Sequence, residues 1–510
     1  MCELPESTKN TNEESVMQNG QILATVDLGS NSFRLQMARL ESGQLVTIDY
    51  YKEPVRLGAG LDEHGFLTPE SIARSVACLE RFAERLRGVA PHAVRAVATQ
   101  SLRSAKNPEA FLEPAQKALG YPIEIIAGRE EARLIYLGVS HDLPTDDVPR
   151  LVVDIGGGST ELIVGTNYTA QHMNSLRIGC VSHTLKFFPD GRPTKRSFEK
   201  AVLAASAVFE EAYAQFGAQH WQYAVGSSGT IETIAELCVA LNAGVEVTTY
   251  PITRERMSQL AKLMLNKPPS KWTFAEIKEQ RAQVLAGGLA VLMGLFHALD
   301  IQEMRPCYSA LRQGVMIDLL GQDTAHDTRE QTMQRLIKRY GVDMSQAMRV
   351  RELALALYAQ IATDAPKLAQ QRLAWAAMTH EVGMAVSHDG YHRHGAYLMA
   401  NTDLAGFSRF AQSYLAELIG AQVGGLRKHA EKFSNLPDFT AHVLCLRLAV
   451  ILAHARVDIA LPQAPLKLKG QKIQWAIEPS WREAHPLSDY LIEEEWRSWD
   501  KVGFTCRASP

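Results

Sequence analysis

The chain has 510 residues, of which 46% are hydrophobic and 21% are charged, and its formal net charge is −3. This length is sufficient for three or four domains, and the composition is ordinary for a soluble globular protein. The small negative charge argues against a general nucleic-acid-binding protein, although it leaves room for a local basic channel. Seven cysteines without a Cys-x-x-Cys pair argue against a cysteine zinc site and suit a reducing cytosol.

The beginning of the chain and its most apolar segment argue against membrane insertion. Residues 1–20 are polar and acidic and lack the apolar centre of a secretory signal, so we expect a disordered lead-in there. The longest apolar helix candidate, 284–299, is shorter than a membrane span and contains His297. We therefore predict a cytoplasmic protein without an integral membrane segment.

Residues 21–135 predict a first ribonuclease-H-like lobe. A helix is expected to begin at Pro69, because Thr68 is a favourable cap and proline and Glu70 are both favoured in a first turn. Another helix is expected from about 130 to 139. The remaining pattern is that of strands, with a hairpin at 23–37 and single strands at 44–50, 94–98 and 123–127. Three strands, helix, strand, helix, strand, helix is the order of a ribonuclease-H-like domain.

Residues 136–322 predict a second lobe of the same kind, because the order begins again at Leu151. An apolar run, a glycine turn and a second apolar run predict a hairpin over 151–164. A strand around Tyr223 leads through small residues into a helix that begins at Ile231, and such a helix start presents N–H groups to an anion. Helices are expected from there to Leu320.

From about residue 324 the strand patterns stop, and long helical patterns continue to about residue 460. A charged loop at 429–438 interrupts them, and residues 465–479 alternate between apolar and polar as a strand pair does. We predict a helical domain over 323–425 and a small C-terminal α+β domain over 426–510. The tail beyond Asp500 carries no prediction.

The segment most informative about chemistry is Asp-Ile-Gly-Gly-Gly-Ser-Thr-Glu at 154–161. Three glycines let the backbone approach a ligand closely, and successive N–H groups form a cradle for an anion. The acids Asp154 and Glu161 flank that cradle. Carboxylates beside a phosphate repel it unless a divalent cation lies between them, so the arrangement predicts Mg²⁺ or Mn²⁺.

The same device occurs earlier in the chain, at an offset of 127 residues. In this alignment Asp27 matches Asp154, Gly29 matches Gly156, and Ser32 matches Ser159, whereas Arg34 takes the place of Glu161. Two copies of one phosphate-holding hairpin predict that the hairpins face each other across a cleft.

These motifs together resemble the exopolyphosphatase / guanosine pentaphosphate phosphohydrolase family, within the superfamily of actin, hexokinase and Hsp70. The segments that carry the resemblance are Asp27–Phe33, Thr99–Arg103, Gly128–Tyr136, Asp154–Glu161, Gly179–Ser182, Gly226–Thr230 and Ala310–Gly314. The resemblance implies an α/β fold of two actin-like lobes around a cleft, followed by an all-α HD-like domain. Glycine at position 158 favours the exopolyphosphatase branch.

The resemblance also assigns roles to residues. Glu131 matches the general base, and Arg103 matches a contact to the phosphoryl group that is transferred. Asp154, Glu161 and Glu131 match metal ligands, and Asp27 is expected to act through water; K⁺ is a further candidate cation. The residues expected to hold phosphate oxygens are Gly29, Ser30, Asn31, Ser32, Gly156, Gly157, Gly158, Ser159, Ser228, Gly229 and Thr230.

The resemblance predicts hydrolysis of terminal phosphate from inorganic polyphosphate, and three alternatives stay open. The first is hydrolysis of the 5′ γ-phosphate of guanosine pentaphosphate, and the second is a non-catalytic sensor of a phosphorylated ligand. The third is structural: Glu130 and Glu131 are also ordinary first-turn acids favoured by the helix dipole, and the resemblance sets this interpretation aside for Glu131 but keeps it for Glu130. A sugar or acetate kinase fits poorly, since nothing marks an acceptor pocket.

The helical region adds weaker expectations. It contains His380-Glu381, where metal-binding HD domains have His-Asp, and this difference argues against a second metal site there. We expect the histidines of this region to be structural or to contact a polyanion. A homodimer through this region is implied by the resemblance only. Five cations could line a channel that guides a long polyanion and makes cleavage processive, or could equally be solvated: Arg393, Arg409, Arg427, Lys428 and Lys432.

Overall fold

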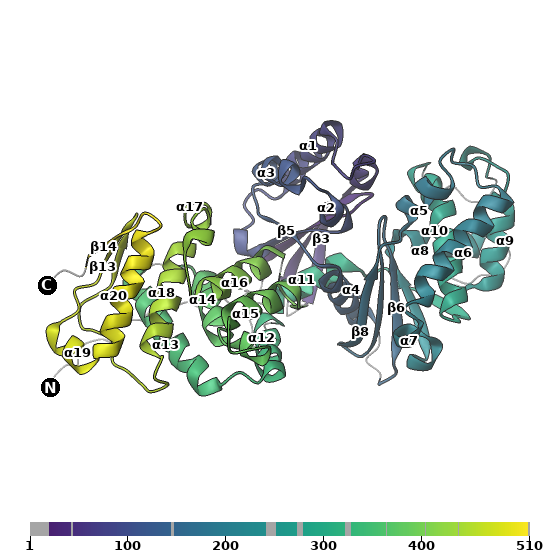
Figure 1. The fold of residues 1–510 in the computed structure, drawn as a ribbon. Helices are drawn as coiled ribbons and strands as arrows, with labels where there is room; N and C mark the ends of the chain where they lie inside the picture. The colour runs from purple at the N-terminus through teal and green to yellow at the C-terminus, as the bar shows by residue number, and fades with distance from the viewer. Residues whose placement is uncertain are drawn as a thin grey trace, which may run out of the picture. The chain divides into compact units, whose positions relative to one another are not determined.

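The computed structural model divides the chain into two compact units, Met1–Thr328 and Arg329–Pro510 (Figure 1). The residues that the structure describes are 20–41, 44–143, 147–240, 251–272, 279–321, 328–363, 365–402, 404–407, 409–436 and 438–507. The predicted lead-in at 1–20 lies almost entirely outside them.

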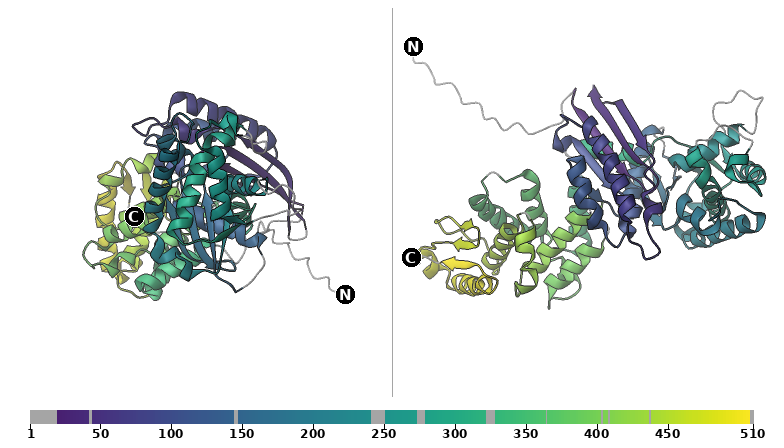
Figure 2. Two further views of the ribbon diagram at one scale, coloured as in Figure 1. Left: turned by 90° about the vertical axis from the view of Figure 1, so that its right-hand side faces the viewer. Right: turned by 90° about the horizontal axis from the view of Figure 1, so that it is seen from above.

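The first sheet of unit 1 has the strand order β3-β2-β1-β4-β5. The first three strands form an antiparallel meander, and β4 and β5 continue the sheet in parallel with β1. The strands are β1 (Ile22–Leu28), β2 (Phe33–Glu41), β3 (Gln44–Glu53), β4 (Val94–Ala98) and β5 (Ile123–Ile125). They confirm the succession of strands along the chain that the sequence predicts. Figure 2 shows the meander from above.

Three helices belong to this lobe: α1 (Pro69–Arg85), α2 (Gln100–Ser104) and α3 (Pro108–Leu119). Helix α1 begins where predicted, and the Thr68 hydroxyl accepts a hydrogen bond from the Ser71 N–H at 3.3 Å. Its buried face, with Leu79 and Phe82, packs into one hydrophobic core with the sheet and with Phe111 of α3. This core holds the first hairpin in place.

The second sheet has the order β10-β11-β9-β6-β7-β8. Its strands are β6 (Arg150–Ile155), β7 (Thr160–Thr166), β8 (Thr169–Leu176), β9 (Tyr223–Ser227), β10 (Ile252–Thr253) and β11 (Glu303–Pro306). Its helices are α5 (Cys180–Phe187), α6 (Lys195–Glu210), α7 (Tyr213–Phe216), α8 (Ser228–Ala240), α9 (Arg254–Met264) and α10 (Glu279–Ala298). The sequence did not predict β10 and β11, because segments this short carry no clear period.

Helix α10 is long and apolar enough to cross a membrane by length and composition, but 61% of its window Arg281–Ala298 is buried inside the structure. Leu289, Leu292 and Phe296 are fully buried in the core of the second lobe. The apolar character of α10 is therefore explained by its packing within unit 1.

Two helices connect the lobes, α4 (Gly128–Asp142) and α11 (Leu311–Gly321). Helix α4 packs on β7 and β8 of the second sheet, and α11 packs on β1 of the first. The helices approach each other at glycines, since a Cβ added at Gly314 would overlap the Leu134 carbonyl. The predicted lobe boundary at 135/136 falls inside α4.

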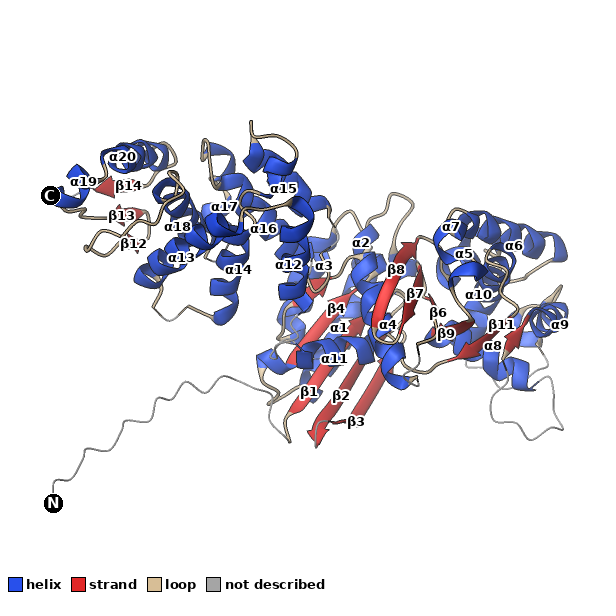
Figure 3. Cartoon of the chain, turned by 90° about the horizontal axis from the view of Figure 1, so that it is seen from below, coloured by secondary structure: helices blue, strands red, loops and turns tan. Residues whose placement is uncertain are grey.

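Unit 2 is mainly helical, and its three strands lie near the C-terminus (Figure 3). Its helices are α12 (Thr328–Tyr340), α13 (Met344–Ile361), α14 (Lys367–Met378), α15 (Tyr391–Asn401), α16 (Arg409–Ala421), α17 (Lys432–Asn435), α18 (Phe439–Leu452), α19 (Pro479–Ala484) and α20 (Pro486–Asp500). Short 3₁₀ turns include η5 (Val382–Ala385) and η6 (Arg427–His429). The strands are β12 (Lys467–Lys469), β13 (Lys472–Gln474) and β14 (Thr505–Arg507).

The expected strand pair at 465–479 is confirmed as β12 and β13, and the tail adds β14, which pairs in parallel with β13. One hydrophobic core includes Leu357 of α13, Leu444 of α18 and Trp499 of α20. The predicted boundary at 425/426 therefore lies inside a shared core, and the C-terminal strands and helices pack with the helical bundle as one body.

Candidate functional site

A cavity of about 530 Å³ lies in unit 1, and its wall combines both glycine hairpins with the start of α8. Its acidic wall residues include Asp27, Glu131 and Asp154. The predicted phosphate ligands in its wall are Gly29, Ser30, Asn31, Ser32, Gly156, Gly157, Ser159, Ser228, Gly229 and Thr230. Gly158, Arg103 and Glu161 are predicted site residues that are not part of the wall.

In the first hairpin, the sequence alignment becomes a cross-strand pair: Asp27 of β1 lies opposite Arg34 of β2. The Arg34 guanidinium is 3.8 Å from the Asp27 carboxylate. Burial raises the pKa of Asp27, and the positive charges of Arg34, Arg312 and Lys52 act in the opposite direction. This hairpin therefore balances its acid with a cation of its own.

In the second hairpin, Asp154 of β6 lies opposite Glu161 of β7, in the same register. The Ser227 hydroxyl donates to Asp154 Oδ2 at 2.6 Å, and the Ser175 hydroxyl donates to Glu161 Oε1 at 2.8 Å. Both acids are buried, and Glu161 Oε2 has no hydrogen-bond partner among the described residues. The second hairpin therefore pairs two acids, whereas the first hairpin pairs an acid with a basic residue.

The pKa values of both acids in this pair are raised. Burial raises the pKa of Asp154 to about 7, and the negative charges of Glu131 and Asp27 act in the same direction. Burial, Glu131 and Asp154 raise the pKa of Glu161 well above its ordinary value. Both pKa shifts indicate that a nearby positive charge would stabilise the ionised form of this acid pair.

The two glycine loops contact each other directly. A Cβ added at Gly157 would lie 2.9 Å from Ser30 Cβ, and a Cβ added at Gly158 would lie 3.2 Å from Gln100 Cγ. On its other side, the second loop accepts hydrogen bonds at 2.9 Å from the start of α5, Cys180 N–H to the Gly156 carbonyl and Val181 N–H to the Gly157 carbonyl. The predicted facing of the hairpins is therefore realised as a direct contact between them.

Glu131 lies in the first turn of α4, and its carboxylate Oε2 accepts a hydrogen bond from Arg103 Nη1 at 2.7 Å. Arg103 also donates to the Ile126 carbonyl and to Gln100 Oε1, at 3.0 and 3.2 Å. Burial raises the pKa of Glu131, Arg103 lowers it, and the Asp27 charge raises it. Glu131 thus reaches the cavity wall with Arg103 supporting it from behind.

The acidic residues of the second hairpin suit a divalent cation. Among the described residues, no three His, Cys, Asp or Glu side chains converge into a ready-made metal site, and Glu131 binds Arg103 instead. The Asp154–Glu161 pair has the expected chemistry, since Glu161 offers a buried oxygen without a partner. Mg²⁺ is usually bound by one or two carboxylates together with substrate phosphates, so this donor set fits it.

The start of α8 contributes a strained residue to the cavity wall. Ser228 has φ 88°, a conformation that is rare for residues other than glycine, and its buried hydroxyl has no hydrogen-bond partner among the described residues. Next to it, the Gly229 carbonyl accepts a hydrogen bond from Arg281 of α10. Strain held at a cavity wall is typical of ligand-binding residues.

A basic cavity of about 300 Å³ adjoins the first and shares Arg34, Tyr50, Lys52 and Arg281 with it. Arg312 completes the set, with its guanidinium 4.6 Å from the centre of the Tyr50 ring. Burial and the charge of Arg34 lower the pKa of Lys52 to about 7. These cations suit additional phosphate groups beside the reacting one.

Sequence reasoning did not select Lys52, Arg281, Arg312 or the supporting serines. Arg312 and Ser227 do lie within motifs that carry the resemblance, and their position there could have marked them. Lys52, Arg281 and Ser175 come from β3, α10 and β8, outside every motif. Only folding brings them to the site.

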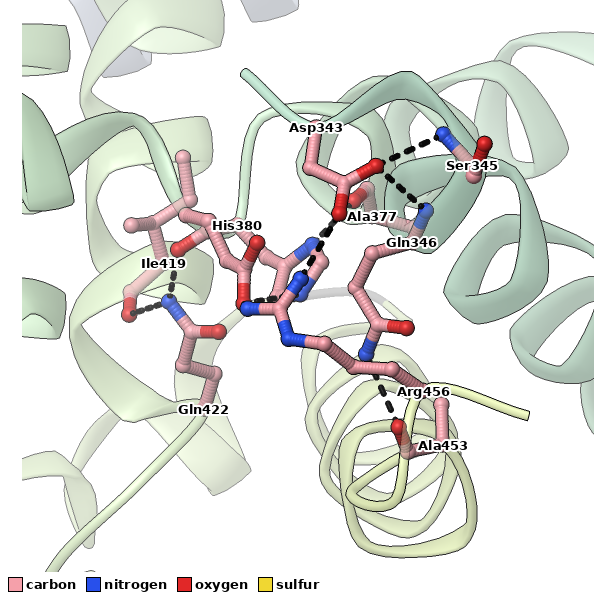
Figure 4. Close-up of polar contacts among 10 residues, drawn as sticks. Asp343, Ser345, Gln346, Ala377, His380, Ile419, Gln422, Ala453 and Arg456 are labelled. Atoms are coloured by element: carbon pink, nitrogen blue, oxygen red, sulfur yellow. Dashed lines mark hydrogen bonds and ion pairs between the residues drawn. The ribbon is translucent and has the colours of Figure 1, made fainter.

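In unit 2, Figure 4 shows a polar cluster that includes His380, Asp343 and Arg456. Glu381 belongs to it through its contacts with His380 and Arg456. Arg456 contacts Glu381 Oε1 at 2.5 Å and Asp343 Oδ2 at 2.9 Å. His380 is buried with its Nδ1 2.7 Å from the Ala377 carbonyl, and burial lowers its pKa to about 4. The cluster joins the start of α13 to the segments around it, as expected of a structural role.

The proposed channel cations take different positions within unit 2. Burial lowers the pKa of His392, followed by the charges of Lys428 and Arg393, so these two cations act on the same histidine. Lys432 is paired with Glu417 at 2.6 Å. Arg427 belongs to η6, and the side chain of Arg409 lies outside the described part of the chain. A guiding role for these residues stays a prediction.

Two lobes that each bring a glycine loop to one cavity, with buried acids in its wall, form a site of the kind that holds phosphate groups. The model of the Ppx/GppA phosphatase family matches residues 37–323, and that of Ppx/GppA phosphatase domain III matches residues 328–496. The chain belongs to the Ppx/GppA phosphatase family.

Known relatives agree with this assignment. A guanosine-5′-triphosphate,3′-diphosphate pyrophosphatase of Pseudoalteromonas translucida (strain TAC 125) is 34% identical over 491 residues, which cover 95% of this chain and 97% of that protein. Two solved structures each cover 59% of this chain and 98% of their own, with TM-scores of 0.53. They are an exopolyphosphatase of Cytophaga hutchinsonii at 24% identity, which shares the fold, and an exopolyphosphatase-like protein at 26% identity.

Proposed function

We propose that this chain is a metal-dependent exopolyphosphatase that removes the terminal phosphate of inorganic polyphosphate by in-line attack of water, processively on long chains. The observation that carries the proposal is the contact between the two glycine loops, at Ser30 and Gly157, beside the buried acids Glu131 and Asp154. Such a site holds phosphates by backbone and hydroxyl groups and keeps a base within reach of water.

Glu131 is the residue that takes the proton. Water attacks the terminal phosphorus, the bridging P–O bond breaks, and the proton of the water passes to the Glu131 carboxylate while the shortened chain leaves. Burial raises the pKa of Glu131, which brings the carboxylate nearer to the strength required of a base at neutral pH. Arg103, outside the cavity wall, holds this carboxylate at 2.7 Å, and its contact with the transferred phosphoryl group stays a prediction.

The two hairpins divide the remaining work. Ser30, Asn31, Gly157 and Ser159 line the cavity as donors to phosphate oxygens. Asp154 and Glu161 would hold Mg²⁺ or Mn²⁺, which when bound neutralises charge on the phosphoryl oxygens. The basic cavity around Arg34 and Lys52 would hold the phosphates that follow along the chain, and it supports a substrate with several phosphates in a row. A role for K⁺ stays a prediction.

Guanosine pentaphosphate is the second candidate substrate, favoured by the relative that is 34% identical over 95% of the chain. The same basic cavity would then hold the phosphates of the nucleotide.

The six described cysteines are all free thiols, which supports the reducing cytosol where both substrates would be met. A homodimer and a part in the stringent response stay predictions.

The test is phosphate release with Mg²⁺ from long-chain polyphosphate and from guanosine pentaphosphate, for the wild type, Glu131→Ala and Glu109→Ala. Glu109 is an exposed acid in the first turn of α3 and serves as a matched control. We expect release from polyphosphate that falls by about 10²–10⁴ in Glu131→Ala only, as loss of a general base predicts. Release from the nucleotide alone would replace polyphosphate by the second candidate. Tight binding without release would indicate a sensor.

A further inference from the structure

A chain of buried charges connects helix α4 with α11 and β4, beside Glu131's ion pair with Arg103. Asp318 of α11 accepts from Arg95 Nη1 of β4 at 2.6 Å and from Arg133 Nη2 of α4 at 2.7 Å. Arg133 in turn contacts both carboxylate oxygens of Glu130 at 2.8 Å. These four residues, Arg95, Asp318, Arg133 and Glu130, form what we name the α4 charge cluster.

The cluster is almost removed from solvent. The exposed fractions of the Arg95, Asp318 and Glu130 side chains are 4%, 3% and 2%. Burial opposes the charge of Arg133, but Glu130 and Asp318 raise its pKa above the ordinary value. Buried ion pairs are weak evidence for stability, because desolvation offsets much of their attraction, whereas their directional hydrogen bonds can specify orientation.

The residue beside Glu130 is Glu131. The hydrogen bond from Arg133 to Asp318 ties α4 to α11, and Glu130, three residues before Arg133 on the same helix, holds the Arg133 guanidinium for that bond. Successive side chains of an α-helix point about 100° apart, so a contact that fixes the rotation of α4 also fixes the direction of Glu131 toward Arg103. Further along α4, a Cβ added at Gly138 would overlap the Ala310 carbonyl. The cluster therefore sets the rotation of α4 at its first turn, and the glycine contact keeps α4 from sliding along α11.

We infer that Glu130 and Asp318 are positioning residues for the reaction: they orient helix α4 so that Glu131 presents its carboxylate at the cavity wall. They touch no substrate and act through Glu131. This inference rests on the proposed role of Glu131 as base. It gives Glu130 a part that a merely favourable first-turn acid would not have.

The test compares kcat and KM for polyphosphate among Glu130→Gln, Asp318→Asn and Glu124→Gln. Glu124 is the matched control, because it contacts the same Arg95 at 3.3 Å but lies on β5, and its side chain is 36% exposed. We expect at least a 10-fold loss of kcat with KM unchanged in the first two variants, and wild-type values in Glu124→Gln. Glu130→Asp, which keeps the charge, should recover part of kcat and also replaces Glu130→Gln if that variant does not fold.

A double variant separates positioning from general destabilisation. In the Glu131→Ala background, Glu130→Gln should cause no further loss of the residual rate, because Glu130 acts through Glu131. An equal loss in both backgrounds, or wild-type kcat in Glu130→Gln, would overturn the inference.

A crystal structure of Glu130→Gln decides the point without any substrate. We expect the 2.7 Å contact between Arg103 and Glu131 to be lost, and its retention would overturn the inference. If the wild type released no phosphate from either substrate, the proposed function would fail, while this structural result would still decide whether Glu130 positions Glu131.

Discussion

The two glycine hairpins share one backbone design and differ in one charge. In both, the penultimate residue of the first strand is an aspartate that lies opposite the second residue of the returning strand, Asp27 opposite Arg34 and Asp154 opposite Glu161. The first hairpin carries its own cation, 3.8 Å from its acid. The second holds two buried acids whose pKa values are raised by burial and by the negative charge of Glu131.

This difference indicates a division of labour between copies of one motif. A hairpin with a balanced charge can hold phosphate oxygens without help, whereas a hairpin with two acids repels a phosphate until a cation is present. The supporting serines follow the same division, since Ser227 and Ser175 orient the acids of the second hairpin only. Under the proposed function, the first hairpin would be the anion-binding side of the site and the second hairpin the cation-binding side.

The largest effect is expected when the second hairpin is given the charge pattern of the first. Glu161→Arg, with Glu161→Gln as the same-sized alternative, should lower phosphate release by at least about 10²-fold. Metal stabilisation of transition-state charge is worth several kcal/mol, and each ~1.4 kcal/mol is tenfold in rate. The measurement is the rate as a function of Mg²⁺ concentration.

Arg34→Leu is the matched change in the first hairpin. It should raise KM and leave the Mg²⁺ concentration for half-maximal rate unchanged, because Arg34 faces the anion-binding side. An unchanged Mg²⁺ dependence in Glu161→Arg would contradict the assigned division.

The next effect concerns pH and the metal-free protein. Unfolded Asp154 loses its proton near its ordinary pKa of 3.8, whereas the folded residue keeps it until about 7. Between these values the folded state binds more protons, so stability should fall as pH rises from about 4 to about 7, by up to ~1.4 kcal/mol per pH unit. Urea unfolding at pH 5, 6 and 7 measures this slope.

Asp154→Asn should make that slope shallower, and Mg²⁺ added at pH 7 should restore stability to the wild type but not to the variant. Some slope should persist in Asp154→Asn, since burial also raises the pKa of Asp27 and Glu131. Equal slopes in the two proteins would show that the raised pKa of Asp154 does not cause the loss of stability with rising pH.

The smallest effect is expected at the contact between the hairpins. Gly157→Ala would place a Cβ 2.9 Å from Ser30 Cβ and 3.3 Å from Val181 Cγ2, and overpacking of this kind costs about 1–3 kcal/mol. Thermal unfolding should show a lower Tm. Gly321→Ala is the control, because a Cβ there would meet no atom of the described residues within 4 Å. An equal Tm for both variants would argue against a direct contact between the loops.

Local sequence determined the two hairpins and the alignment of one on the other. Glycine turns between short apolar runs specify strand, turn and strand, and the offset of 127 residues by itself aligns Asp27 with Asp154 and Arg34 with Glu161. The cap at Thr68 and the first turn of α4, with Glu131, followed in the same way. These features depend on backbone preferences within a few residues, so a single sequence is sufficient to predict them.

Tertiary structure alone decided what surrounds the hairpins. Lys52 and Arg281 reach the basic cavity from β3 and α10, and Asp318 meets Arg133 across 185 positions of sequence. Strand β14 and helix α20 join the core of the helical bundle although the sequence predicted a separate C-terminal domain. Such contacts depend on which faces of distant elements pack together, and that choice is set by burial over the whole unit, where no local period reports it.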